Sequence, residues 1–351
     1  MRCVGNNDRC SLLAMASVVL CLALSTGAAA TEFTFVALGD MPYGPREQAY
    51  PAFEALIAEI NRRAPAFTFH LGDTKSGLDP CSDELLLEQR DFMDSFASAL
   101  VYTPGDNEWT DCHRLLAGAY DPLERLAFIR THYFPTDESL GGRPIRLERQ
   151  ADVMPGFESF VENSRFNRGG VWLVTAHVVG SNNNFDAVEG SATTGEFLAR
   201  DKANRIWLAD SFDKATAADA GAVVVAIHAD MFGDGFDPKQ ETFAPNSGYK
   251  RFAETLIKKT QSFRKPVLLL FGDSHVYRVF QPFPRSAGNV TAVEVYGAEL
   301  MHAVAVTLRL DPTPVFTFSP LPNPALPAPP RPRTHVIGDL LHFPTLPAPL
   351  D

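Results

Sequence analysis

The stretch Phe67–Gly77, FTFHLGDTKSG, is an apolar run of strand-forming residues that stops at Gly72-Asp73 and opens into a polar turn. Short runs of β-branched and aromatic residues that end at glycine are typical of buried strands. Similar runs end on Gly-Asp or on His-Ala-Asp at Phe33–Asp40, Ala99–Asp106, Ala222–Asp230 and Pro266–Asp273. Since ligands of open α/β sheets bind beyond the carboxyl ends of the strands, the pattern predicts a metal site at five strand ends.

A single Gly-Asp pair has a simpler explanation, because it is a common turn signal. The pair occurs six times, and neither Gly233-Asp234 nor Gly338-Asp339 follows a strand-like run. The other four pairs do, and histidines accompany two of these strand ends, at Ile227-His228 and Ser274-His275. The recurrence therefore favours metal ligands over unrelated loops.

The segments between these runs show helical spacing of apolar residues. Helices are predicted at Tyr50–Arg62, Ser82–Ala97, Pro122–Thr131, Thr194–Phe212 and Tyr249–Thr260. This β-α alternation indicates a parallel sheet. Residues 135–168 are rich in turn formers and are predicted to be irregular, and Gly170–Val179 is predicted to be a strand. Beyond His275, short antiparallel strands are predicted at Val276–Phe280, Thr291–Tyr296, Ala303–Arg309 and Val315–Phe318.

Both ends of the chain differ in composition from its centre. Residues 1–30 have early arginines, an apolar stretch and a final Ala28-Ala29-Ala30, which predicts a secretory signal cleaved after Ala30. No later segment is long and apolar enough to predict a membrane span. Residues 31–318 are predicted to form the functional domain, and 319–351, dense in proline, a tail that wraps the domain or stays mobile.

Cysteine content and charge narrow the compartment and the partners. Cleavage would leave only Cys81 and Cys112, and a disulfide between them is the default in a secreted or periplasmic protein. Two free thiols or two thiolate metal ligands are the alternatives. Such a bridge would close a loop of ~30 residues and contribute roughly 3 kcal/mol. The formal net charge of −11 argues against a nucleic-acid partner.

The acceptors at the strand ends, in chain order, are Asp40, Asp73, Asp106, His228, Asp273 and His275. Their order and spacing resemble the calcineurin-like metallophosphoesterases, which include the purple acid phosphatases and carry the motifs GDxH, GDxx, GNH(D/E), a lone strand-end His and GHxH. The resemblance spans Phe33 to Tyr277. It implies a four-layer α/β/β/α sandwich of two mixed sheets and a centre of two divalent metal ions.

The letters of the motifs depart from the family pattern at several positions. Pro42 replaces a ligating histidine, Asp106 an asparagine, Asn107 the histidine that assists the phosphate or the leaving group, and Asp273 a further histidine. The resemblance implies that Asp73 bridges the two metals. One ion would bind Asp73, Asp106, His228 and Asp273, and the other Asp40, Asp73 and His275, with water or Tyr43 completing it.

Four carboxylates and two imidazoles form an oxygen-rich ligand set, which favours Mn²⁺, Mg²⁺ or Ca²⁺ over zinc or iron. The predicted function is metal-dependent hydrolysis of a small phosphorylated substrate (a phosphomonoester, a phosphodiester or a nucleotide) by water that the metals activate. Asn107 would donate to the phosphoryl group, Glu108 would orient Asn107 or lie behind the ligands, and His113 is a candidate substitute acid. Lys75 and Arg114 are solvated loop residues or sources of positive charge. The alternative function is a degenerate protein that binds metal or a phosphorylated ligand without turnover.

Overall fold

The computed structural model describes residues 32–186, 192–310, 315–330 and 333–335. The predicted signal segment, residues 1–30, lies outside the described residues, as does the end of the proline-rich segment beyond residue 335. Within the described part of the chain, no helix has the length and hydrophobicity needed to cross a bilayer.

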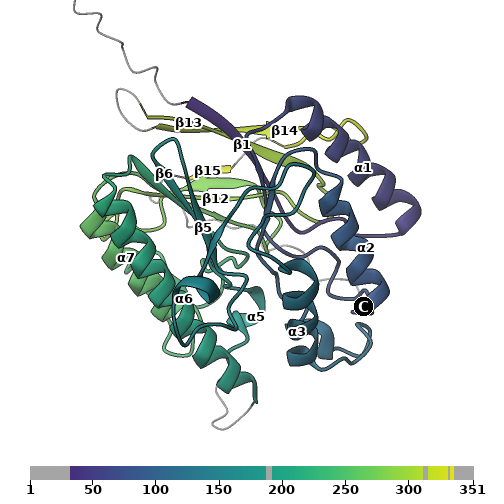
Figure 1. Cartoon of the computed structure of the whole chain (residues 1–351), viewed down its shortest axis with the longest axis horizontal. Coiled ribbons are helices and arrows are strands. Elements are labelled where there is room, and N and C mark those ends of the chain that lie inside the picture. Colours follow the sequence, from purple (N-terminus) through teal and green to yellow (C-terminus); the bar gives the residue numbers. More distant parts are fainter. Residues whose placement is uncertain (1–31, 187–191, 311–314, 331–332, 336–351) are drawn as a thin grey trace, which may run out of the picture.

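Two large mixed sheets form the centre of the fold (Figure 1). The first has the strand order β14-β13-β1-β2-β3, in which β1, β2 and β3 run parallel and β13 runs antiparallel to both of its neighbours. Its strands are β1 (Glu32–Leu38), β2 (Thr68–His70), β3 (Leu100–Tyr102), β13 (Ala303–Arg309) and β14 (Val315–Leu321).

The second sheet has the strand order β15-β11-β12-β10-β7-β6-β5-β4, and its four central strands β12, β10, β7 and β6 are parallel. Its strands are β4 (Glu148–Arg149), β5 (Ser164–Arg168), β6 (Val171–Thr175), β7 (Ala222–Ala226), β10 (Val267–Phe271), β11 (Arg278–Phe280), β12 (Val290–Glu294) and β15 (Arg333–His335). A separate hairpin joins β8 (Phe236–Asp237) to β9 (Thr242–Phe243).

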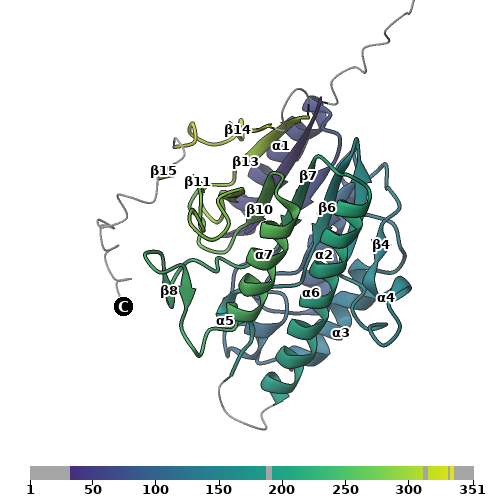
Figure 2. The same ribbon diagram turned by 90° about the vertical axis from the view of Figure 1, so that its left-hand side faces the viewer.

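Helices cover the outer faces of the two sheets. In Figures 1 and 2, α6 and α7 lie on the second sheet, and α1, α2 and α3 lie on the side of the first. The helices are α1 (Arg46–Arg63), α2 (Asp83–Asp94), α3 (Pro122–Tyr133), α4 (Gln150–Val153), α5 (Gly180–Asn183), α6 (Ala192–Ala217) and α7 (Lys250–Phe263), with a 3₁₀ turn η1 (Thr110–His113). The predicted cap of α2 is confirmed, because the Ser82 side chain accepts a hydrogen bond from the Leu85 N–H.

The alternation of side chains along β7 explains the layering. Val223 and Val225 pack with Trp207 of α6 in the outer core, whereas Val224 packs with Phe69 of the opposite sheet in the central core. Because successive strand residues point to opposite faces, the fully apolar β7 can be buried on both sides. A third core joins the first sheet to its own helices. The predicted four-layer α/β/β/α sandwich is confirmed.

Three local predictions differ from the structure. The segment predicted to be irregular contains β5, whose only apolar residue is Phe166 and whose buried Arg165 is held by Glu148 and Asp210. Strand β12 runs parallel to β10, not antiparallel. In the proline-rich segment, β14 extends to Leu321 and β15 adds an edge strand to the second sheet.

Candidate metal centre

The five predicted strand ends meet at one edge of the two sheets. Asp40 follows β1, Asp73 follows β2, Asp106 follows β3, His228 follows β7 and Asp273 follows β10. The Nε2 atom of His228 lies 3.0 Å from Asp106 Oδ1, 3.5 Å from Asp73 Oδ1 and 4.0 Å from Asp273 Oδ1. Acceptors that follow strands of two separate sheets therefore meet in one cluster.

Two groups of three acceptors have ligand atoms close enough to share a cation. They are Asp40, Asp73 and His228, and Asp106, His228 and Asp273, with all ligand atoms of a group within 4.8 Å of one another. The sixth predicted ligand, His275, places its Nε2 atom 3.6 Å from Asp40 Oδ1. His228 therefore stands between the two groups.

A backbone contact fixes the orientation of the central imidazole. His228 Nδ1 lies 2.7 Å from the carbonyl oxygen of Leu71, which can only accept, so Nδ1 carries the proton. The lone pair of a neutral ring then resides on Nε2, the atom that faces the carboxylates. This arrangement is typical of a histidine that ligates metal.

Glycines make room for the carboxylates. A Cβ atom on Gly105 would lie 2.0 Å from Asp73 Oδ1, and one on Gly272 would lie 2.2 Å from Asp40 Oδ2. A Cβ atom on Gly180 would lie 2.7 Å from both carboxylate oxygens of Asp106. Any side chain at these positions would occupy the space of the ligands.

The backbone at the ligands adopts uncommon conformations. Asp40 and Asp73 have φ of 56°, His275 has φ of 62° and Asp273 has φ of 80°. Positive φ is unfavourable for residues with a Cβ atom and is concentrated at functional sites. The sharp turns at the strand ends thus aim these four side chains at the cluster.

Burial of several carboxylates in one place shifts their protonation. Burial raises the pKa of Asp273 to about 7. The nearby His228 lowers this pKa, and the negative charge of Asp106 raises it further. Burial also raises the pKa of Asp73 well above its usual range. The pKa of His228 is raised well above its usual value because the nearby carboxylates, Asp73 first, outweigh the opposing effect of burial. One imidazole cannot balance the charge of the four aspartates around it, and divalent cations would supply the remaining positive charge.

Asp73 has further partners at its second oxygen. The Tyr43 hydroxyl donates to Asp73 Oδ2 at 2.8 Å, and Asn107 Nδ2 donates to the same atom at 2.5 Å. Asn107 Nδ2 also lies 2.8 Å from the Tyr43 hydroxyl. Tyr43 therefore points inward, and the Asn107 side chain lies beside Asp73.

Structural comparison supports the architecture. The chain aligns with a dimetal phosphatase from Danio rerio with a TM-score of 0.52 and 12% identity, covering 83% of this chain and 99% of that one. The chain has the calcineurin-like metallophosphoesterase fold. A 5'-nucleotidase from Candida albicans aligns with a TM-score of 0.46 and 13% identity over 82% of this chain and 50% of that one. The purple acid phosphatase PPD1 of yellow lupin aligns with a TM-score of 0.42 and 12% identity, and the alignment covers 79% of this chain and 49% of that one. In sequence comparisons, no protein-family model matches and no curated protein is significantly similar.

Glu108, which the sequence predicted to orient Asn107 or to lie behind the ligands, is buried between two ligand loops. Its carboxylate is fully buried and accepts hydrogen bonds from the backbone N–H groups of Thr74 and Gly105 and from the Tyr102 hydroxyl. Two of these donors belong to the loops that carry Asp73 and Asp106. Glu108 therefore ties the two ligand loops together and does not contact the Asn107 side chain through any of these bonds.

Ser181 is a site residue that sequence reasoning missed. Its hydroxyl lies 2.8 Å from Asp106 Oδ2 and 2.9 Å from Asp111 Oδ1. Residues 181–184 all have φ between 50° and 56° and form a left-handed turn. Contacts from elsewhere hold it, since Arg200 donates to the Asn183 carbonyl and the Gly248 N–H donates to Asn182 Oδ1.

A second missed group supports the loop of Asp273. The Asp230 N–H donates to Asp273 Oδ2 at 3.0 Å, and the Asp230 carboxylate accepts from Ser274 Oγ and from Arg278. Arg278 also pairs with the buried Glu294. The only signal in the sequence was the Ala229-Asp230 that follows His228, which the strand-end pattern already included.

The other side chains named from sequence divide between the site and its surroundings. Arg114 forms an ion pair with Asp111 at 2.6 Å. A Cβ atom added to Gly77 would lie 2.7 Å from Arg114 Nη1 and 2.7 Å from Asn107 Oδ1. Arg114 thus faces Asn107 across a glycine. His113 Nδ1 lies 2.7 Å from the Thr110 carbonyl. Lys75 is not solvated as a loop residue would be, because only 1% of its surface is exposed.

The disulfide predicted between Cys81 and Cys112 is confirmed, with a Cα–Cα distance of 5.7 Å. Both half-cystines are buried and pack with Ala117. The bridge connects the segment after Asp73 to η1, which follows Asp106. It therefore joins two ligand loops covalently.

The residues present fit divalent cations. The cluster combines four aspartates with two imidazoles, an oxygen-rich donor set that suits hard or borderline divalent ions. Asp40, Asp73 and Asp106 are buried, and burying several carboxylates without a compensating cation is costly.

Proposed function

We propose that the protein is a metal-dependent phosphoesterase that hydrolyses a phosphomonoester, a phosphodiester or a nucleotide. The observation that carries the proposal is the convergence of four strand-end carboxylates on the Nε2 atom of His228 and the neighbouring His275. Two divalent ions, when bound, would supply positive charge to the phosphoryl oxygens and lower the pKa of a water.

The chain's own residues would hold the ions and the phosphoryl group. Asp40, Asp73, Asp106, His228, Asp273 and His275 are the proposed ligands. Asn107 donates its two amide hydrogens to Asp73 Oδ2 and to the Tyr43 hydroxyl, so it would donate to a phosphoryl oxygen by exchanging one of these bonds. Arg114 faces Asn107 and would add positive charge that the aspartate-rich ligand set lacks. Glu108 would act as a positioning residue by holding two ligand loops together.

The absence of an acidic proton on Asn107 limits the leaving group. An amide cannot protonate an alkoxide, and a positioned acid typically contributes about 10²–10⁴-fold to the rate. We therefore expect esters with acidic leaving groups, such as aryl phosphates, to be turned over faster than alkyl phosphates of the same size.

The test is to measure hydrolysis of aryl phosphate monoesters and diesters by the full chain with Mn²⁺, Mg²⁺, Ca²⁺ or Zn²⁺ added, beside an Asp73→Asn variant. The proposal expects turnover that requires metal and is lost in the variant. Bound metal without turnover of any ester would favour the alternative, a protein that binds metal or a phosphorylated ligand. The two donors on Asp73 Oδ2 are the observation that favours this alternative, because they occupy an oxygen that a bridging ligand offers to metal.

We also propose that the protein acts in an oxidising compartment, secreted or periplasmic. The Cys81–Cys112 disulfide supports this location, because such bonds are rare in reducing compartments. N-terminal sequencing of the exported protein is the test, and a start at Thr31 is expected.

A further inference from the structure

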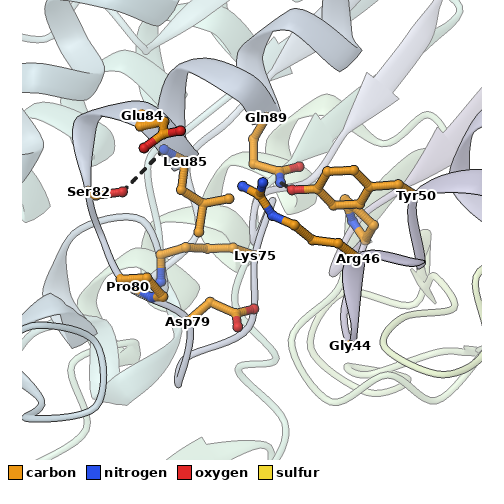
Figure 3. Close-up of a pocket in the computed structure, with 11 residues that line it drawn as sticks. Gly44, Arg46, Tyr50, Lys75, Asp79, Pro80, Ser82, Glu84, Leu85 and Gln89 are labelled. Carbon is orange, nitrogen blue, oxygen red and sulfur yellow. Dashed lines mark hydrogen bonds between the residues drawn. The ribbon is translucent and has the colours of Figure 1, made fainter. Parts of the chain in front are cut away.

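A cavity of about 360 Å³ is lined by the segments that follow Asp40 and Asp73 and by the first turns of α1 and α2. Pro42 and Lys75, each two residues beyond one of these aspartates, form part of its wall. Figure 3 shows Lys75 extended along the cavity between Asp79 and Leu85, with the Arg46 guanidinium directed toward the same space. The volume is within the range of about 300–1,000 Å³ that small-molecule sites occupy.

Lys75 is the unusual member of this wall. Its side chain is almost wholly buried, and its ammonium makes one described hydrogen bond, to the carbonyl oxygen of Ser76 at 3.1 Å. Among the described residues, no carboxylate forms an ion pair with it within 4.0 Å. Burial opposes the charge on Lys75, and the carboxylates that favour it, Glu108 first, act from beyond ion-pair distance. The cavity therefore contains a cation with spare donors.

The other charges of the wall already have partners or face solvent. Arg46 pairs with Glu88. Asp79 Oδ2 accepts a hydrogen bond from the Ser76 N–H, and Glu84 is exposed, where water screens its charge. Lys75 is thus the buried charged group of this cavity, and an anionic ligand would complement it.

We propose that this cavity receives an acidic group carried by the leaving group of the phosphoester, and that Lys75 pairs with it. The inference rests on the proposed function, since the phosphoryl group would lie at the metal ligands while the leaving group extends past Pro42 into the cavity. It assigns the substrate class: phosphoesters whose alcohol or phenol bears a carboxylate or a second phosphate. Lys75 is a specificity residue in this account.

The experiment compares 4-carboxyphenyl phosphate with 4-carbamoylphenyl phosphate, two esters of nearly equal size that differ by one negative charge. For the metal-loaded wild-type protein, kcat/KM is expected to be at least about tenfold higher for the carboxylate, the effect of one hydrogen-bonded charge pair. In Lys75→Met this ratio should fall to about 1. Lys258→Met, which removes an exposed lysine on α7, should keep the wild-type ratio. A wild-type ratio near 1, or a ratio that Lys75→Met leaves unchanged, would overturn the proposal.

A binding measurement separates the cavity from the proposed function. Calorimetric titration with (4-carboxybenzyl)phosphonate and its carbamoyl analogue needs no turnover. A preference for the carboxylate that is lost in Lys75→Met supports the cavity even if neither ester is hydrolysed, an outcome that would count against catalysis alone. Equal affinity for the two phosphonates would overturn the inference.

Thermal unfolding provides the test against a structural role. Because Met retains an unbranched apolar chain like the stem of Lys and removes a buried charge, Lys75→Met should unfold at the wild-type temperature or above it. A markedly lower Tm would assign Lys75 to stability instead of ligand binding and would overturn the proposal.

Discussion

The hydroxyl of Tyr43 donates a 2.8 Å hydrogen bond to Oδ2 of Asp73, the carboxylate that is proposed to bridge two metal ions. This contact orients the ligand from the loop that follows β1, the strand next to β2 in the first sheet. Partners that orient metal ligands in this way contribute substantially to affinity, typically 10–100-fold.

Tyr43→Phe removes only this hydroxyl. We expect about tenfold weaker binding of Mn²⁺, because the carboxylate loses the donor that holds its orientation. Calorimetric titration of metal-free protein measures the effect. Tyr120→Phe is the matched control, since its hydroxyl makes no described hydrogen bond and its ring still stacks against Arg125. Equal or tighter Mn²⁺ binding by Tyr43→Phe would show that the hydroxyl competes with the metal.

Gly105→Ala tests the packing of the carboxylates. The added Cβ atom would lie 2.0 Å from Asp73 Oδ1 and 2.5 Å from the Asp73 backbone nitrogen, so the ligand must move. Loss of most bound metal is expected, with a lower Tm. Gly195→Ala on α6 has nothing within 4 Å of the new atom, and it should raise stability by about 0.5–1 kcal/mol. Full metal content in Gly105→Ala would contradict the described geometry.

Removal of the disulfide tests its contribution to stability. Cys81→Ser with Cys112→Ser opens a covalent loop with a sequence separation of 31. The free energy of unfolding should fall by about 3 kcal/mol, measured by denaturant unfolding. Because the bridge ties two ligand loops, metal affinity should fall as well. Reaction of the untreated wild-type protein with a thiol reagent at Cys112 would show that the bond is absent.

Glu162 gives the fold a pH dependence away from the metal centre. Its carboxylate is fully buried, 2.6 Å from Arg130 and 2.8 Å from His177 Nδ1. Although burial opposes ionisation, Arg130 and His177 lower its pKa below the ordinary value of 4.5. A carboxylate with a lowered pKa stabilises the fold at pH values above 4.5, and this contribution is lost as the pH falls toward the folded-state pKa.

Glu162→Gln should therefore be less stable than wild type by about 3 kcal/mol at pH 7, since it leaves the half-buried Arg130 without its counter-charge. The difference between the two proteins should shrink as the pH falls below 4.5, where the unfolded carboxyl protonates. Urea unfolding at several pH values measures it. The exposed Glu59, also paired with arginines, is the control, and Glu59→Gln should cost less than about 1 kcal/mol. A difference independent of pH would refute the assignment.

The order of the ligands along the chain could be predicted because a local sequence signal marks each strand end. Each of Asp40, Asp73, Asp106 and Asp273 follows a glycine that ends an apolar run, and the parallel strands bring those ends to one edge. The disulfide was predicted from the number of cysteines that remain after the signal segment, and the four layers from the resemblance of the motifs to the metallophosphoesterases. The assignment of ligands to two groups could not be predicted from the sequence. His228 belongs to both candidate groups, and only the three-dimensional arrangement shows this.

The missed features depend on distant contacts. Ser181 reaches Asp106 through a left-handed turn that Arg200 stabilises from α6, and no pattern in a polar turn announces such a conformation. Strand β5 buries a charged residue because Arg165 forms ion pairs with Glu148 and Asp210 and lies over the ring of Trp207 of α6. The burial of Lys75 likewise arises from neighbouring segments and not from its own loop.

The most direct test of the central claim is the position of bound cations in crystals of the full chain soaked with Mn²⁺, located by anomalous scattering. The account predicts two manganese peaks, both within coordination distance of acceptors around His228 Nε2 and sharing Asp73, and none in crystals of Asp73→Asn. Peaks absent from this cluster, or located elsewhere on the protein, would contradict it.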